Sequence, residues 1–448
     1  MTYERLRQPW NAVAVARALV AWWHQLPRDP DAVPDVEAFQ HAEALRRARI
    51  MLRGSSELEA TPRAQSFIVG GAVLDGVAVS RVIDASHRLA LLFEQVNDSA
   101  RTSDRSLFAE PLRRWLHHVE LTGSEKESTQ SLRSDAGNEA GLSSKVKVVR
   151  MSEPMMAGVL LEVIWNEYDR ARRPVLQWLV ELCASRDETV RVLAALAVGK
   201  LAALDFEIID ERIFRSWSQD KNYGQVLAWA LESVVVDGRL SRRVLDLLQT
   251  WATGSDFQQR ATAIRAYGTS IGARNPKDAI KGIDSAYRGQ IPMERITVRS
   301  LVEIYISGHR EDVLGKLDDW AGRGGRYRTR AASCLMLLAD LNSPYAKKIA
   351  RPDLLSVLSK SEELRRPMVR LWAAGLADSA VHGDAWTLLG IWRAIGSGEE
   401  GSRHSAARFA ADVLEEAGAR PEIRTRLNFY ERLWESKKVS RLAQVARI

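Results

Sequence analysis

Apolar residues recur with helical spacing over most of the chain, and residues 188–204 show the pattern most clearly. The apolar positions there follow the i, i+3, i+4, i+7 spacing of one helix face, and they are Val190, Leu193, Ala194, Ala197, Val198 and Leu201. Ser185 and Glu188 stand just before this run at the three-residue spacing of a capping box. The pattern predicts a capped helix, and no strand pattern of comparable strength occurs elsewhere.

The same pattern repeats along the C-terminal two thirds of the chain. A bulky residue closes an apolar helical stretch every 33 to 39 residues, at Trp178, Trp217, Trp251, Tyr287, Trp320, Leu358 and Trp392. A polar turn and a second helical stretch follow each of them. A helix pair of this length cannot bury its apolar face alone, so neighbouring pairs must stack. We therefore predict an all-α fold, an α-solenoid of about seven helical hairpins.

A smaller helical region is expected to precede the repeats. Apolar periodicity predicts helices near residues 10–26, 35–52, 65–96 and 106–121. The next stretch is rich in Ser, Gly and Glu, a composition that cannot bury a core. The predicted organisation is an N-terminal helical region over 1–121, a flexible polar linker over 122–147, and the solenoid with a basic tail over 148–448.

The second helices resemble those of HEAT repeats. The segment RDETVRVLAALAVGKLA has an acidic residue at the helix start, Asp187, and an arginine four residues later, Arg191. Asp256 and Arg260 repeat this spacing, and Arg330 occupies the place of the arginine in a later repeat. The resemblance implies that these residues form a ladder between adjacent repeats and are structural. The remaining repeats keep only part of the pattern.

A fainter resemblance concerns the N-terminal block around AVLDGVAVSRVIDASHRLA. It is similar to helical regions of bacterial proteins that carry such arrays as C-terminal sensor arms beside an NTPase. The chain itself contains no Gly-rich loop ending in Lys-Ser or Lys-Thr, the sequence that would cradle nucleotide phosphates. The glycines of residues 322–327 lack that ending.

Composition adds a prediction of location and of core residues. The longest nearly uncharged apolar run is too short to span a bilayer, and no signal peptide follows the start, so a cytoplasmic protein is expected. Cys183 and Cys334 lie on apolar helical stripes and are interpreted as core residues. Trp178, Trp217 and Trp251 are interpreted in the same way, because they recur at one helical phase.

Sites of catalysis or metal binding are not predicted. His117 and His118 are adjacent, and successive helical side chains diverge too far to share a tetrahedral metal. Asp318 and Asp319 are interpreted as solvated acids at a helix end, and no zinc-protease or serine-nucleophile motif occurs. We expect a non-enzymatic protein without cofactor or metal.

Two basic clusters are the candidate interaction surface. The first contains Arg323, Arg326 and Arg328, and the second lies in the tail at Arg424, Arg426, Lys437, Lys438 and Arg441. The net charge is +7, of which residues 420–448 contribute +5 (eight Lys or Arg minus three Glu). The predominance of Arg over Lys is typical of GC-rich bacterial genes, which weakens charge as a sign of nucleic-acid binding.

Three functions remain open at this point, the third being an enzyme in the N-terminal part. The first is a non-catalytic scaffold or sensor arm that binds a protein partner through an extended surface, with no membrane partner. The alternative is a nucleic-acid-binding HEAT-like protein, related in architecture to the HEAT-type DNA glycosylases but without a match to their catalytic residues. A continuous basic stripe would favour nucleic acid, whereas mixed charge with exposed apolar residues would favour protein.

Overall fold

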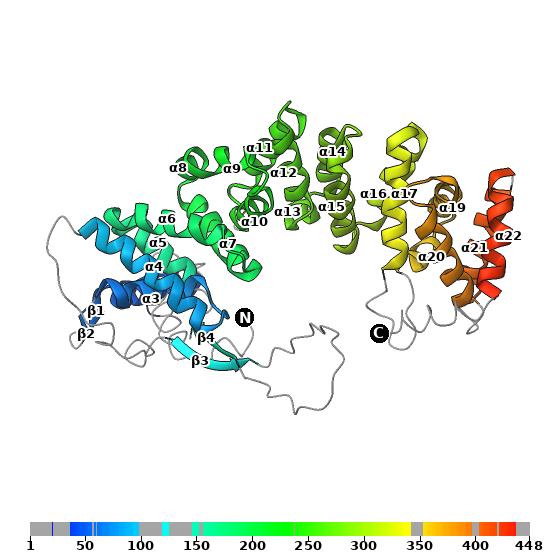
Figure 1. Cartoon of the computed structure of the whole chain (residues 1–448). Coiled ribbons are helices and arrows are strands. Elements are labelled where there is room, and N and C mark those ends of the chain that lie inside the picture. Colours follow the sequence, from blue (N-terminus) through cyan, green and yellow to red (C-terminus); the bar gives the residue numbers. More distant parts are fainter. Residues whose placement is uncertain are drawn as a thin grey trace, which may run out of the picture. The chain divides into compact units, whose positions relative to one another are not determined.

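Helices make up most of the computed structural model, which describes Val20 and residues 36–55, 58–59, 61–97, 119–124, 146–151, 156–236, 238–341, 353–396, 403–418 and 421–435 (Figure 1). The helical fold class is confirmed, and two short antiparallel strand pairs add to it. The chain divides into unit 1, Met1–Ser216 with Trp229–Leu240, and unit 2, Trp217–Ala228 with Ser241–Ile448. A helix that is long and apolar enough to cross a membrane is not found in the described residues.

Unit 1 consists of helices and the two strand pairs. Its helices are α2 (Val36–Arg53), α3 (Pro62–Val73), α4 (Val79–Asn97), α5 (Met156–Glu167), α6 (Asp169–Cys183), α7 (Glu188–Leu204), α8 (Phe206–Ile209) and a π-helical turn (Asp210–Phe214). The strands are β1 (Gly54–Ser55), β2 (Leu58–Glu59), β3 (Val119–Ser124) and β4 (Val146–Met151). β3 pairs with β4 in the register Val119↔Met151 to Ser124↔Val146. The predicted helix over 65–96 is two helices, and the predicted helix over 10–26 lies outside the described residues.

The predicted boundary at residues 122–147 is not the division that the structure shows. Both ends of this segment belong to the paired strands β3 and β4, so residues 119–121 are strand where a helix was predicted. Helices from before and after the segment pack together, α2 with α5 and α4 with α6. Trp178 Nε1 donates to the Ala85 carbonyl at 2.8 Å, and Arg88 binds the Glu181 carboxylate at 2.6 and 2.7 Å. The early helices thus bury their apolar faces against later ones, which segment composition alone does not reveal.

Unit 2 consists of a succession of helices, and the division from unit 1 passes through α9 and α10. These helices are α9 (Arg215–Gln219), α10 (Gly224–Val234), α11 (Ser241–Thr253), α12 (Phe257–Tyr267), α13 (Ser270–Arg274), α14 (Pro276–Tyr287), α15 (Glu294–Ile306), α16 (Arg310–Arg323), α17 (Gly325–Asp340), α18 (Asp353–Leu358), α19 (Glu362–Ala377), α20 (His382–Gly396), α21 (Arg403–Gly418) and α22 (Pro421–Glu435). A 3-10 turn, Ile291–Met293, precedes α15. Each predicted second helix coincides with a helix: α7, α10, α12, α15, α17, α19 and α21.

Helices α12 and α15 pack side by side and run in the same direction, and α15 also packs against α17. Arg260 at the start of α12 binds Gln290 just before α15, and Gly268 at the end of α12 lies against Ser300 well inside α15. The contact positions therefore advance together along both helices. This is the arrangement expected of corresponding helices in successive repeats.

The direction of neighbouring helices changes after α17. Thr329 near the start of α17 donates to Asp378 at the end of α19 at 2.5 Å, and Gly375 of α19 lies near Ala332. α19 is therefore antiparallel to α17. Trp392 of α20 donates from Nε1 to the Ala339 carbonyl of α17 at 3.2 Å, so α19 and α20 both contact α17. Trp392 lies on α20, and the helix that follows it, α21, packs against α20.

The start of α7 also differs from the prediction. Its N-cap is Asp187, whose carboxylate accepts hydrogen bonds from the backbone N–H groups of Thr189 and Val190 at 3.0 and 3.3 Å. Ser185 instead accepts from the backbone N–H of Asp187 at 3.2 Å. The predicted capping box of Ser185 and Glu188 is therefore wrong, and Glu188 is the first residue of the helix.

Candidate interaction surface

The first basic cluster lies where α16 meets α17, and its first arginine is bound by acids. Asp284 of α14 accepts hydrogen bonds from Arg323 at 2.8 and 2.6 Å, from Lys316 at 3.1 Å and from Trp320 Nε1 at 2.8 Å. Asp319 accepts from Lys316 at 2.9 Å and from Arg323 at 2.8 Å. The two cations and two carboxylates form a neutral cluster that joins α14 to α16.

The electrostatics of this cluster stabilise its charged state. Burial opposes ionisation of Asp284, but the hydrogen bonds from Arg323, Trp320 and Lys316 outweigh it and lower the pKa of the carboxyl. The hydrogen bond to Asp284 likewise raises the pKa of Arg323. The Arg323 guanidinium also lies over the Tyr327 ring, 5.1 Å from its centre. Arg323 therefore holds helices together within unit 2.

The other arginines of this cluster have different environments. Arg330 of α17 forms an ion pair with Glu294 at the start of α15. Arg326 donates to the Gly289 carbonyl at 3.3 Å and Arg328 to the Ala321 carbonyl at 3.2 Å. Both of these side chains are exposed. Arg326 and Arg328 thus keep much of their charge at the surface, whereas Arg330 is used inside the fold.

The tail cluster is described only in part. Arg424 and Arg426 lie on α22 and are exposed, and Arg424 donates to the Gly418 carbonyl at 3.3 Å. Lys437, Lys438 and Arg441 lie outside the described residues, as do His117 and His118. The structure does not bring the α22 arginines together with Arg326 and Arg328 in any described contact.

The residues of the proposed repeat ladder do not all pair with charged partners. Asp187 and Asp256 are N-caps, and Arg191 donates to the backbone carbonyls of Ser185 and Arg186. Arg260 is buried and binds the Gln290 side chain at 2.9 Å, which links α12 to the turn before α15. The described contacts of Arg191 and Arg260 thus differ from the Asp–Arg ladder that the family resemblance implies.

The recurrent aromatic residues are buried. Trp178, Trp217, Trp251, Trp320 and Trp392 are each no more than 5% exposed. Trp320 packs against Tyr287 and Tyr327, and Trp392 packs against Trp372 and Phe409. None of these five tryptophans offers a ring face on which a nucleic-acid base could stack.

Two exposed apolar residues on neighbouring second helices were not singled out by the sequence analysis. Ile306 of α15 is 55% exposed and Leu337 of α17 is 51% exposed. Exposed charges of both signs accompany them on the same helices, namely Arg295, Arg299 and Glu303 on α15 and Asp340 on α17. Helical periodicity could have identified Leu337 as exposed, because it lies outside the apolar stripe of Ala331, Leu335 and Leu338 that faces the core.

The remaining candidates for chemistry among the described residues are the two cysteines and the acidic side chains. Cys183 and Cys334 are buried, and burial raises the pKa of each thiol to about 12. Among the residues that the structure describes, no group of three or more His, Cys, Asp or Glu is arranged to hold a metal ion. Asp319 is engaged with Lys316 and Arg323, as described above.

Comparison with known proteins gives no neighbour for this chain. No family model, curated protein or solved structure matches it significantly. Class and function are therefore inferred from the contacts within the chain itself.

Proposed function

We propose that the chain is a non-catalytic interaction scaffold, built as a HEAT-like α-solenoid, that binds a protein partner. The stacking of α12 on α15 in one direction, and of α15 on α17, supports the solenoid, since successive repeats present corresponding helices side by side. In unit 2 the later helices in contact include α16 with α17, and α20 with α21. A sensor arm of a larger assembly would use the same kind of surface.

The observation that carries the choice of partner is the set of exposed side chains on α15 and α17. It combines the apolar side chains of Ile306 and Leu337 with charges of both signs. Protein interfaces use apolar anchors surrounded by polar groups, whereas nucleic-acid surfaces are dominated by positive charge. Asp284 and Asp319 also neutralise Arg323 of the first basic cluster.

The test is a comparison of surface variants of the full-length protein. Tagged wild type and the double variant I306S/L337S are used to capture partners from lysate of the source cells, with and without nuclease. The matched control is Ile291→Ser, because Ile291 is 57% exposed but lies at the opposite end of α15. All three proteins should unfold at the same temperature, since the substituted side chains are exposed.

We expect one protein partner that wild type and I291S retain, that I306S/L337S loses, and that nuclease does not remove. Purified partner should then bind wild type directly in titration calorimetry. A partner that disappears with nuclease, or duplex DNA binding that weakens steeply with salt, would refute the scaffold and favour the nucleic-acid alternative. Equal capture by I306S/L337S and wild type would refute the assignment to this face.

A further inference from the structure

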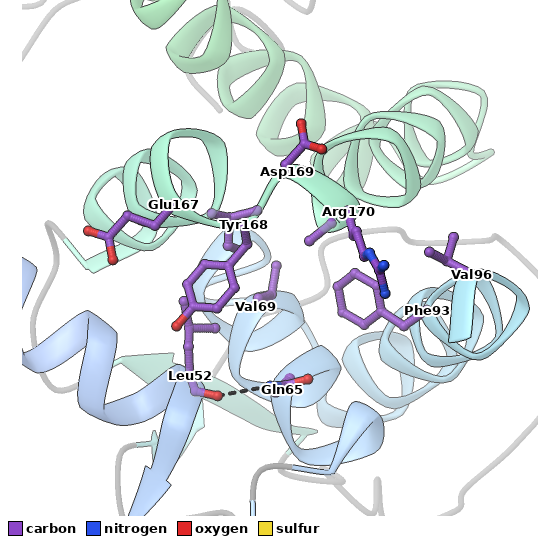
Figure 2. Close-up of a pocket in the computed structure, with 11 residues that line it drawn as sticks. Leu52, Gln65, Val69, Phe93, Val96, Glu167, Tyr168, Asp169 and Arg170 are labelled. Carbon is purple, nitrogen blue, oxygen red and sulfur yellow. Dashed lines mark hydrogen bonds between the residues drawn. The ribbon is translucent and has the colours of Figure 1, made fainter. Parts of the chain in front are cut away.

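Unit 1 contains a pocket between its helices that the proposed scaffold function does not use. Its volume is about 440 Å³, within the range of small-molecule sites, about 300–1,000 Å³. An apolar cavity of about 150 Å³ is enough to hold a benzene molecule, so this pocket has room for two fused rings. Its apolar lining includes Leu52 of α2, Val69 of α3, Phe93 and Val96 of α4, and Ile164 of α5 (Figure 2).

Burial divides the lining into an apolar interior and a charged rim. Leu52, Val69 and Ile164 are each no more than 5% exposed. The charged members of the lining are exposed to solvent, namely Glu167, Asp169 and Arg170. A charged group that moved into the interior would lose its hydration without gaining an opposite charge there, which is unfavourable. The interior therefore favours an uncharged ligand.

The polar group that the interior offers to a ligand is a hydrogen-bond acceptor. Gln65 Nε2 donates to the Leu52 carbonyl at 2.9 Å, and no described residue donates a hydrogen bond to the Gln65 Oε1. The Tyr168 hydroxyl points toward Leu52 in Figure 2 and interacts with Arg53 at the end of α2. Gln65 Oε1 is thus the acceptor that remains, and a ligand must supply the donor.

Aromatic side chains lie close to this acceptor. Gln65 and Val69 are four residues apart on α3, so they are neighbours on one face of the helix. The Phe93 ring lies on one side of Val69 and the Tyr168 ring on the other (Figure 2). Aromatic rings attract one another in offset or edge-to-face arrangements. A ligand ring above Val69 would therefore have aromatic neighbours while a substituent reaches Gln65.

We propose that this pocket binds a neutral aromatic alcohol, whose rings pack against Val69 and Phe93 and whose hydroxyl donates to Gln65 Oε1. A carboxylate has no proton to donate at neutral pH, and it would bring a charge into the apolar interior. A hydrocarbon of the same shape would leave the Gln65 oxygen without a donor. The aromatic alcohol meets both conditions, and its binding does not require the partner surface of α15 and α17.

The experiment is isothermal titration calorimetry of the full-length protein with 2-naphthol. 2-Methoxynaphthalene has a similar shape but no donor, and 2-naphthoate carries a negative charge. Gln65→Met removes the acceptor and keeps a side chain of similar length, and its control is Gln95→Met, at an exposed glutamine outside the pocket. Val96→Trp places a bulky side chain at the edge of the pocket, and its control is Leu91→Trp, also at an exposed position of α4 but outside the lining.

We expect wild type to bind a single molecule of 2-naphthol, about fivefold more tightly than 2-methoxynaphthalene, which is the effect of one neutral hydrogen bond. Q65M should remove this preference, because the acceptor is gone, and Q95M should keep it. V96W should abolish 2-naphthol binding, whereas L91W should leave it unchanged.

Absence of 2-naphthol binding, or equal binding by wild type and V96W, would overturn the site. Tighter binding of 2-naphthoate than of 2-naphthol would overturn the assignment of an uncharged ligand. A preference for 2-naphthol that wild type lacks, or that Q65M retains, would overturn the role of Gln65. Circular dichroism and melting temperature establish that each variant is folded, and if V96W is not, the comparison of Q65M with Q95M decides.

Discussion

The carboxylate of Asp284 is predicted to be a main support of the packing between α14 and α16. Its side chain is only 15% exposed and accepts four hydrogen bonds from Lys316, Trp320 and Arg323. Loss of one partner of a buried ion pair costs about 3–5 kcal/mol. The effect here is smaller, because Asp319 still contacts both cations and Arg323 is partly exposed. We expect Asp284→Asn to lower the free energy of unfolding by about 2 kcal/mol.

The matched control is Asp319→Asn. Asp319 contacts the same Lys316 and Arg323, but its side chain is 46% exposed, so we expect a loss below about 1 kcal/mol. The assay is urea unfolding at pH 7, followed by circular dichroism and tryptophan fluorescence. An Asp284→Asn variant that is no less stable than Asp319→Asn would refute the reasoning, because burial would then have no effect on the strength of the cluster.

The pH dependence gives a second check on Asp284. Hydrogen bonds lower its pKa in the folded protein below the ordinary Asp value of about 3.9. A depressed folded-state pKa contributes stability that is fully present above the unfolded value and is lost as the pH falls through the folded value. The difference between wild type and Asp284→Asn should therefore be constant near neutral pH and shrink below about pH 4. A difference that persists unchanged in acid would contradict an ionic role.

Three other predictions follow from the packing. Gly199→Ala should destabilise unit 1 by about 1–3 kcal/mol in urea unfolding, since an added Cβ would lie 2.2 Å from a backbone oxygen of α10, whereas Gly315→Ala in open space should be neutral or stabilising. Trp251→Ala should cost about 3–5 kcal/mol by the same measurement, and an unchanged unfolding midpoint would contradict its core position. Cys183 and Cys334 should react with a thiol reagent at pH 8 only after denaturant is added, because burial raises both pKa values to about 12.

Helical periodicity predicted the elements of this fold well because each signal is contained within one helix. The apolar stripe of residues 190–201 coincides with the buried face of α7, and the tryptophans at the repeat phase are buried. The cap of α7 was misplaced because Ser185, Asp187 and Glu188 all suit a helix start, and only the backbone conformation of Asp187 selects among them. Strand β3 was missed because its sequence, VELTGS, lacks a clear alternation and its partner lies beyond residue 145.

The pocket of unit 1 could not be predicted from the same patterns. Its wall residues Leu52, Val69, Phe93 and Ile164 come from four helices, and each looks like an ordinary core position in its own helix. What creates the cavity is the angle and spacing between helices, which are set by packing at other positions. Gln65 carried no distinguishing signal either, since it is a single polar residue in the first turn of α3.

Several polar contacts join residues that are far apart in the sequence, and these pairs cannot be identified from the local sequence. Trp320 with Asp284, Arg330 with Glu294 and His309 with the Ala273 carbonyl are each 36 residues apart, which falls within the predicted spacing of 33 to 39 residues. Arg330 and Arg323 thus pair with acids that lie 36 and 39 residues earlier in the sequence. The local sequence of residues 322–330 therefore overstates the free positive charge of this segment. Across α18 the interval changes, to 49 residues for Thr329 with Asp378 and 53 for Trp392 with Ala339. α19 runs antiparallel to α17, a change of direction that the spacing of apolar residues does not encode.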